Sequence, residues 1–212
     1  MAEVKICGLS DPEGVDAALV GGARYVGFVF FPKSPRNIIA EKAAHLAVAA
    51  RGRADIVAVT VDADDEHLAL IARTLRPDWI QLHGAETPAR TAAARRFATK
   101  GVIRAMGVAR SADLAAMDGF AEAADAFLFD AKAPPDAALP GGNGAAFDWR
   151  ILANRRFAKP WLLSGGLDAA NVAEAIGASA ARAVDVSSGV ERAPGVKDPL
   201  RIAAFLAAAK NA

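Results

Sequence analysis

Short apolar runs alternate with longer alanine-rich stretches along the whole chain. The runs are rich in Val, Ile and Phe, and their first residues lie roughly 20 to 34 positions apart, which is the size of a strand–helix unit. A strand of a parallel sheet is apolar throughout because both of its faces are covered. The runs that we predict as strands are Val4–Cys7, Tyr25–Phe30, Ile56–Val61, Trp79–Leu82, Val102–Ala105, Ala126–Phe129, Pro160–Leu163 and Ala183–Val186.

The stretches between the runs predict helices, since several of them begin and end with capping signals. An Asp at the N-cap position, a Pro at the first helical position or a Gly after the last turn marks these ends. The helices predicted in this way span residues 12–20, 168–176 and 199–210. The helical spacing of Leu68, Ile71, Ala72 and Leu75 predicts a further helix over residues 64–75.

Eight strand–helix units in 212 residues leave no room for a second domain. An open doubly wound sheet usually has five or six strands, so eight units favour a closed (β/α)8 barrel. We therefore predict one α/β domain over residues 1–212, a small TIM barrel with short loops. Its one long connection, residues 130–147, is rich in Pro and Gly, and connections of this length are often functional.

Composition and charge argue against several classes of binding partner. A net charge of +1 lacks the basic excess that wide contact with nucleic acid requires. The longest apolar runs, such as residues 202–209, are far shorter than a bilayer span. A single cysteine, Cys7, forbids an internal disulfide and fits a reducing compartment. We expect a cytoplasmic protein without a nucleic-acid or membrane partner, and nothing in the sequence indicates an obligatory protein partner.

Two strand ends carry groups that can move protons. The active site of such a barrel lies where its strands end, and Cys7 and Asp130 stand at the ends of the first and sixth predicted strands. Cys7 is either a buried structural thiol or, if its surroundings lower its pKa, a general base. Asp130 is a helix cap, an ion-pair partner or, beside apolar walls, a protonated general acid. An acid and a base across a barrel mouth suit an isomerisation.

The turns after the seventh and eighth strands are glycine-rich and suggest a phosphate site. They read Ser164-Gly165-Gly166 and Ser187-Ser188-Gly189. Glycines let the backbone approach a ligand closely, and free amides attract an anion. Tight turns between strand and helix are the alternative for either loop alone. Since these two loops together form the recurrent phosphate site of the barrel, we favour a phosphorylated small-molecule substrate.

The remaining polar candidates are less specific. Arg36 offers a bidentate fork for a carboxylate or is a solvated loop arginine, and His83 is a ligand-facing donor or a rim residue. His45 and His67 fall in predicted helices and should face solvent. The histidines are not spaced for zinc, and no Gly-x-Gly-x-x-Gly motif follows the first strand. We expect neither a metal nor a cofactor.

An ordered set of motifs resembles the phosphoribosylanthranilate isomerases of tryptophan biosynthesis. The motifs follow one another from the first strand to the loop after the eighth, so the resemblance covers nearly the whole chain. They are Val4-Lys5-Ile6-Cys7-Gly8-Leu9, Gly27-Phe28-Val29-Phe30 with Ser34-Pro35-Arg36, Gln81-Leu82-His83-Gly84, Phe129-Asp130, Gly141-Gly142-Asn143-Gly144 with Phe147-Asp148-Trp149, Leu163-Ser164-Gly165-Gly166-Leu167 and Val184-Asp185-Val186-Ser187-Ser188-Gly189-Val190-Glu191.

The resemblance implies a TIM barrel that performs an Amadori rearrangement of N-(5'-phosphoribosyl)anthranilate. Cys7 matches the general base of the family and Asp130 its general acid, and Arg36 matches the position that holds the anthranilate carboxylate. Gln81, His83 and Asp185 lie in matched motifs and are expected at the substrate. The matched phosphate-binding residues are Gly142, Asn143, Gly144, Gly165, Gly166, Ser187, Ser188 and Gly189, with Asn143 standing where the family usually has Thr or Ser.

Three other functions remain open on the residues alone. The aldose–ketose isomerase of histidine biosynthesis runs the same chemistry but carries Asp where this chain has Cys7. A sugar-phosphate epimerase would need inward-facing histidine and carboxylate metal ligands. A non-catalytic barrel that binds a phosphorylated ligand would keep the phosphate loops and leave Cys7 as an inert thiol.

Overall fold

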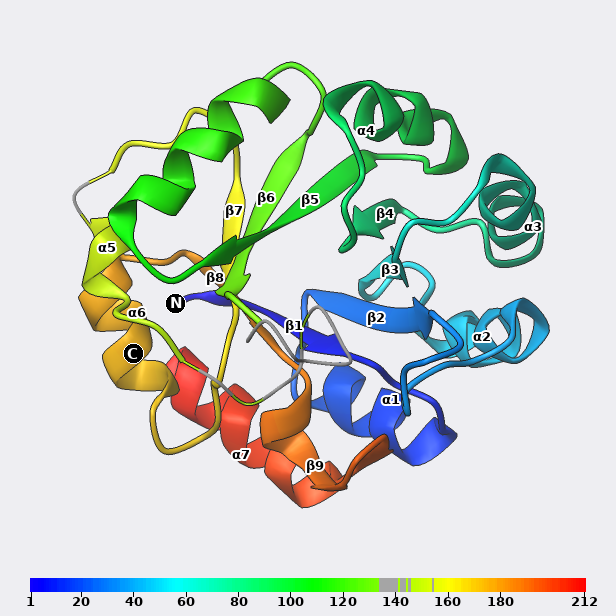
Figure 1. Cartoon of the computed structure of the whole chain (residues 1–212). Coiled ribbons are helices and arrows are strands. Elements are labelled where there is room, and N and C mark those ends of the chain that lie inside the picture. The colour runs from blue at the N-terminus through cyan, green and yellow to red at the C-terminus, as the bar shows by residue number, and fades with distance from the viewer. Residues whose placement is uncertain (134–140, 142–143, 145, 154) are drawn as a thin grey trace.

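The chain folds into a closed barrel of eight parallel strands (Figure 1), as predicted. This computed structural model describes residues 1–133, 141, 144, 146–153 and 155–212. Neighbouring strands in the barrel follow sequence order, and β1 pairs with β8 to close it. The strands are β1 Glu3–Cys7, β2 Tyr25–Phe30, β3 Asp55–Thr60, β4 Trp79–Leu82, β5 Gly101–Val108, β6 Ala126–Ala131, β7 Trp161–Leu163 and β8 Ala183–Val186.

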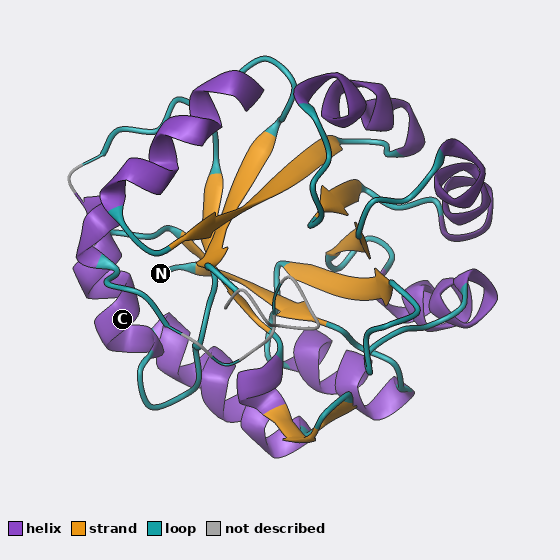
Figure 2. Ribbon diagram, viewed as in Figure 1, coloured by secondary structure: helices purple, strands orange, loops and turns teal. Residues whose placement is uncertain are grey.

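Helices surround the barrel on its outside (Figure 2). A 3-10 helix, η3 Ser111–Phe120, takes the helical position between β5 and β6. A short hairpin of β9 Glu191–Ala193 and β10 Val196–Lys197 follows β8. The α-helices are α1 Pro12–Val20, α2 Ala40–Ala47, α3 Asp65–Leu75, α4 Pro88–Ala94, α5 Arg150–Ala153, α6 Val172–Ser179 and α7 Pro199–Lys210; the other 3-10 helices are η1 Val48–Ala50, η2 Arg95–Phe97 and η4 Ser188–Val190.

The local signals located most elements closely. All eight predicted runs are strands, and the caps predicted for α1 and α7 each accept a backbone N–H from the first turn. Asp64, predicted as the first residue of a helix, instead caps α3 by accepting the N–H of His67. The helix predicted over residues 168–176 is wrong at both ends. The Asp168 carboxylate instead closes a turn on the N–H groups of Ala170 and Asn171, and α6 begins after it. The helix continues through Gly177 and ends where Ala180 turns left-handed, at φ 57°.

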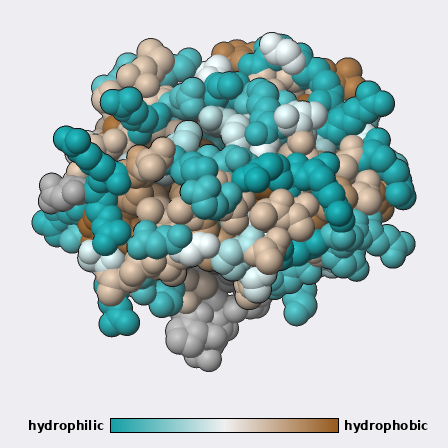
Figure 3. Space-filling view, turned by 90° about the horizontal axis from the view of Figure 1, so that it is seen from above, coloured by the Kyte–Doolittle hydropathy of each residue, from teal (hydrophilic) through white to brown (hydrophobic). Residues whose placement is uncertain are grey.

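The core has two parts because side chains alternate along each strand. Outward-facing residues such as Ile6, Phe28 and Phe127 pack against the helices. Inward-facing residues fill the barrel itself, and Cys7 belongs to this set together with Val57. The flank of the molecule in Figure 3 is mostly hydrophilic, with apolar residues scattered between the polar ones.

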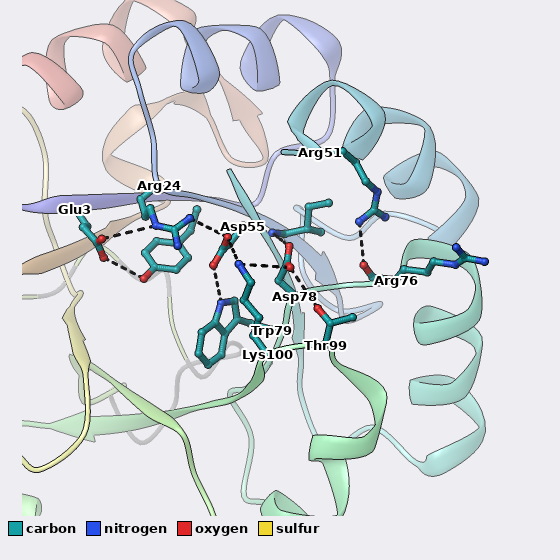
Figure 4. A network of polar contacts seen from close by, with 11 residues as sticks. Glu3, Arg24, Arg51, Asp55, Arg76, Asp78, Trp79, Thr99 and Lys100 are labelled. Atoms are coloured by element: carbon teal, nitrogen blue, oxygen red, sulfur yellow. Dashed lines mark hydrogen bonds and ion pairs between the residues drawn. The ribbon is translucent and has the colours of Figure 1, made fainter. Parts of the chain in front are cut away.

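Charged and polar residues gather at the end of the barrel where strands begin (Figure 4). The buried carboxylate of Asp55 accepts hydrogen bonds from Arg24 at 2.8 Å, Trp79 at 3.0 Å and Lys100 at 2.6 Å. Burial alone would raise the pKa of Asp55, but these three donors outweigh it and lower the pKa. The network ties β2, β3, β4 and the start of β5 together at the end away from the strand C-termini.

A buried ion pair fixes the loops that follow β3 and β4. Arg104, on β5, lies 2.6 Å from Glu86 and also donates to the carbonyl oxygen of Gly84 at 2.9 Å. Glu86 in turn accepts the N–H of Asp62, in the loop after β3. Arg104 thus holds in place the loop that carries His83 at its start.

We predict that Arg104→Met lowers the free energy of unfolding by about 3–5 kcal/mol, because it leaves the Glu86 carboxylate buried without its cation. Urea denaturation measures this loss. The control is Arg95→Met, which breaks the half-exposed pair of Arg95 with Asp125 and should cost only about 0–1 kcal/mol. Equal losses in the two variants would contradict the role of the buried pair.

Candidate active site

A cavity opens where the barrel strands end, and it collects nearly all the candidate residues. It encloses about 830 Å³, part of it open solvent. Gly142 and Asn143 lie outside the described residues. The candidates that line the cavity are Cys7, Arg36, Gln81, His83, Asp130, Gly144, Gly165, Gly166, Asp185, Ser187 and Ser188.

Gly189 is the described candidate that does not line the cavity. A Cβ atom at this position would lie 1.9 Å from the carbonyl oxygen of Leu167. Gly189 therefore lets the loop after β8 pack directly against the loop after β7. Its contribution to the site is the close approach of these two loops, which only a residue without a side chain allows.

Cys7 lies beside an ion pair in the interior of the barrel. Lys5 is two residues earlier on β1, so its side chain also points inward, and it is completely buried. Its Nζ donates to Oδ1 of Asp185 at 2.8 Å, and Oδ2 of Asp185 accepts from the Ser164 hydroxyl at 3.0 Å. Lys5 and Asp185 are register partners of β1 and β8.

The pKa of the Cys7 thiol is raised. Burial raises it most, the positive charge of Lys5 opposes that effect, and the negative charge of Asp185 adds to it. Cys7 was expected to act as a base if its surroundings lower its pKa. The protein groups around Cys7 together raise this pKa, so they do not meet that condition. Burial would lower the pKa of Lys5, but Asp185 and Cys7 outweigh it and raise that pKa, so Lys5 is a permanent cation.

Asp130 stands at the end of β6 and is buried, with one oxygen fixed by the backbone. Its Oδ1 accepts the N–H of Ala131 at 2.8 Å. Its Oδ2 lies 3.3 Å from Nε2 of His83, whose Nδ1 is 3.4 Å from Nε2 of Gln81. If Gln81 donates to Nδ1, then Nε2 of His83 carries a proton and donates to Asp130. The carboxyl is thus oriented by Ala131 on β6 and by His83 in the loop after β4, and it is not engaged as a helix cap.

Arg36 is buried and binds a carboxylate of the protein itself, so it is not the solvated loop arginine that the sequence left open. Its Nε and Nη2 donate to the two oxygens of Glu191 at 2.7 and 2.9 Å. Glu191 also accepts from Nζ of Lys197 at 2.7 Å, and Lys197 reaches the Ser187 carbonyl oxygen at 2.9 Å. Burial would raise the pKa of Glu191, but Arg36 and Lys197 outweigh it and lower that pKa. The β9–β10 hairpin therefore links Arg36 to the loop after β8.

Lys5, Glu191 and Lys197 were missed as functional candidates when the sequence was considered by itself. Lys5 carried a usable signal, since a lysine inside an apolar strand run and two residues before Cys7 must face the same interior. Glu191 carried only its place at the end of the matched motif after the eighth strand, and its partner Arg36 is far away in sequence. Lys197 carried no signal, because the short hairpin on which it pairs with Glu191 has no apolar period.

The loop after β7 contains two glycines in a left-handed backbone conformation. Gly165 and Gly166 adopt φ values of 94° and 62°, which glycine reaches without strain. Within the described part of the chain, their N–H groups donate no hydrogen bond. The Ser187 hydroxyl donates to the carbonyl oxygen of Cys7 at 3.1 Å, which joins this region to β1.

Among residues 1–133, 141, 144, 146–153 and 155–212, no three His, Cys, Asp or Glu side chains are grouped so that they could hold a metal ion. In that same part of the chain, no helix has the length and apolar character needed to cross a membrane.

We predict that Gly165→Ala lowers the free energy of unfolding by about 1–3 kcal/mol, since it strains a positive-φ backbone. Its Cβ would also lie 2.6 Å from the Ala131 nitrogen. The control is Gly177→Ala, in the middle of α6, where a Cβ meets nothing within 4 Å. That variant should gain roughly 0.5–1 kcal/mol from helix propensity. Thermal unfolding of both distinguishes them, and a neutral Gly165→Ala would contradict the strain argument.

Comparison with known proteins gives a consistent result. The family model of N-(5'phosphoribosyl)anthranilate (PRA) isomerase matches residues 4–208. The N-(5'-phosphoribosyl)anthranilate isomerase of Afipia carboxidovorans is 54% identical over 209 residues, covering 99% of this chain and 89% of the relative. That of Rhizobium meliloti is 50% identical over 210 residues, covering 99% and 98%.

Solved structures agree with these sequence relatives. The crystal structure of phosphoribosyl anthranilate isomerase from Thermotoga maritima has a TM-score of 0.89 and 36% identity, with both chains fully covered. A crystal structure of phosphoribosyl anthranilate isomerase in complex with reduced 1-(o-carboxyphenylamino)-1-deoxyribulose 5-phosphate has a TM-score of 0.85 and 33% identity, again with full coverage of both. This chain belongs to the N-(5'-phosphoribosyl)anthranilate isomerase family.

Proposed function

We propose that this chain converts N-(5'-phosphoribosyl)anthranilate into 1-(2-carboxyphenylamino)-1-deoxyribulose 5-phosphate in tryptophan biosynthesis, as an aldose–ketose isomerase. The observation that carries the proposal is the placement of Cys7 and Asp130 on one cavity, from β1 and β6, together with the glycine-rich loops after β7 and β8. The family membership supplies the substrate.

Asp130 acts as the general acid that opens the ribose ring. Its Oδ1 accepts the Ala131 N–H and its Oδ2 faces Nε2 of His83 at 3.3 Å, so the carboxyl group is held at the cavity, where it delivers its proton to the substrate. The acid protonates the furanose ring oxygen while the lone pair of the anilino nitrogen forms a C=N bond to C1 and breaks the C1–O bond. The substrate then carries an iminium cation, and Asp130 is left as a carboxylate.

Cys7 acts as the general base in the second step. Its thiolate removes the proton at C2, and the released electron pair forms the C1=C2 bond and neutralises the iminium nitrogen. The resulting enolamine becomes the ketone when C1 gains a proton and the C2 hydroxyl loses one. One proton is removed at C2 and one is added at C1, so the sugar is internally oxidised and reduced. The iminium charge helps the thiolate, because a nearby cation lowers a thiol pKa.

The polar groups around the cavity hold the ends of the substrate. Arg36 contacts the anthranilate carboxylate through its Nη1 and the second N–H of Nη2. Its Nε and the first N–H of Nη2 already donate to Glu191. Gln81 accepts a hydrogen bond from the substrate, next to His83. Its Oε1 is buried and has no hydrogen-bond partner among the described residues. The residues proposed at the phosphate are Gly142, Asn143, Gly144, Gly165, Gly166, Ser187 and Ser188. Gly189 supports them by letting the loop after β8 lie against the loop after β7.

The proposed setting is the cytoplasm, where a reducing environment keeps a catalytic thiol free. The balanced charge of the chain supports a role without nucleic acid. The proposed partner is the phosphorylated substrate alone, with no metal, cofactor, membrane or obligatory protein partner.

The direct test follows the loss of phosphoribosylanthranilate fluorescence with purified protein and a chelator present. Rapid loss of the signal, with the ketose product identified by mass spectrometry, is the expected result. Binding of the substrate without turnover would overturn the proposal and favour a barrel that only binds phosphorylated ligands.

We predict that Cys7→Ser and Asp130→Asn each reduce kcat by about 10²–10⁴-fold, the usual contribution of a general acid or base. Circular dichroism should show that both variants keep the fold. Asp118→Asn is a matched control at an exposed aspartate and should leave kcat unchanged. A Cys7→Ser variant that keeps near-normal turnover would exclude the thiol as the base.

We predict that Glu191→Gln raises KM roughly tenfold, equivalent to about 1.4 kcal/mol of binding, because Arg36 loses the anion that orients it. The matched measurement uses phosphoribosylaniline, which lacks the carboxylate. For that analogue the KM of Glu191→Gln should equal that of the wild type. An equal rise for both compounds would mean that Glu191 supports the loop after β8 and not the contact of Arg36 with the carboxylate.

A further inference from the structure

Lys5 is a completely buried cation for which the proposed reaction steps have no use. It is one of the largest fully buried side chains, lying among the inward-facing residues of the barrel. A buried ammonium group is costly unless it is paired, and Asp185 at 2.8 Å provides the pair. A pair of apolar residues would fill the same space at lower cost, so the retained charge points to a role for it.

The position of Gly27 shows how close the charge lies to the thiol. Gly27, on β2, is the register partner of Cys7 on β1. A Cβ atom on Gly27 would lie 3.2 Å from Nζ of Lys5 and 3.3 Å from Sγ of Cys7. The ammonium group of Lys5 and the sulfur of Cys7 therefore both border the space that a side chain at position 27 would occupy. The absence of that side chain leaves room for both groups.

We propose that Lys5, held in place by Asp185, is a positioning residue that stabilises the thiolate of Cys7 and so keeps the general base available. The proposal rests on the proposed function, since it takes Cys7 as the base. Lys5 acts on the thiol and not on the substrate. In the free enzyme, the positive charge of Lys5 stabilises the thiolate. After the ring has opened, the iminium charge of the substrate also stabilises it.

Several elements bring charged or titratable groups toward Cys7. Lys5 on its own strand favours the thiolate, and Asp185 on β8 opposes it. Lys197 on β10 also favours the thiolate, although burial lowers the pKa of Lys197 itself. β2 presents Gly27 and Val29, which carry no charge, and Arg36 follows that strand. Asp130 and His83 line the same cavity from β6 and from the loop after β4. Lys5 is thus the cation with the largest favourable effect on the thiolate.

A purely structural ion pair between β1 and β8 is the competing explanation, and the two differ in what they predict for the thiol. The chain has one cysteine, so a ¹³C-labelled cysteine gives a single NMR signal whose shift reports the ionisation of Cys7 directly. This measurement needs neither substrate nor turnover. The expected shift of the Cys7 titration can therefore be absent in a protein that is an active isomerase, and it can be present in a protein that shows no turnover.

The first variant is Lys5→Met, which removes the cation and leaves Asp185 in place. Loss of an opposite charge should raise the Cys7 pKa by about one unit or more. The rise of kcat/KM with pH should move to higher pH by the same amount, because the base must be deprotonated to act. Asp185→Asn should shift the thiol titration the other way, toward lower pH.

The double variant Lys5→Met/Asp185→Asn keeps the test independent of folding problems, because it leaves no buried charge unpaired. Its opposing effects should bring the Cys7 titration closer to the wild type than either single variant does. Gly27→Ala provides a second route that removes no charge. Its methyl group separates and desolvates the ammonium group and the sulfur, and should also raise the Cys7 pKa.

A Cys7 titration that is unchanged in Lys5→Met would overturn the proposal and leave Lys5 as a structural ion-pair partner. If Lys5→Met does not fold, the proposal is overturned when the double variant titrates at the same pH as Asp185→Asn and Gly27→Ala titrates as the wild type does. A wild-type protein that titrates as expected but shows no turnover would instead overturn the proposed function.

Discussion

The pairing of β1 with β8 is the constraint on which the site depends. Closure of the barrel sets Lys5 opposite Asp185, which are 180 positions apart in the chain, and brings the ion pair next to Cys7. The same closure sets the loop after β8 against β1, where Ser187 bonds to the carbonyl oxygen of Cys7. An open sheet would leave these groups at two separate edges.

Ion pairs differ in their burial at the two ends of the barrel, and the buried pairs lie at the end that carries the candidate active site. Where strands begin, Asp55 is bound by the half-exposed side chains of Arg24 and Lys100, which water can replace at little cost. Where strands end, the cations Lys5 and Arg36 are buried and have specific carboxylate partners. Buried pairs are a poor source of stability but fix geometry, which is what an acid, a base and an anion clamp need.

Much of this arrangement could be predicted from local patterns. The apolar runs gave all eight strands, since a doubly covered strand has an unmistakable composition, and the number of units favoured a barrel over an open sheet. The barrel rule then placed Cys7 and Asp130 on the same face without any contact being known. The prediction at Asp168 failed because an aspartate can close a turn as well as cap a helix, and the local sequence does not distinguish the two.

The sequence by itself determined the order of strands and helices, the residues at strand ends and, through the motifs, the family. Only the tertiary structure decided that Glu191 occupies one edge of Arg36 and that burial raises the pKa of the Cys7 thiol despite Lys5. Periodicity and caps depend on residues a few positions apart, whereas ion pairing and desolvation depend on distances that exist only once remote strands have closed the barrel.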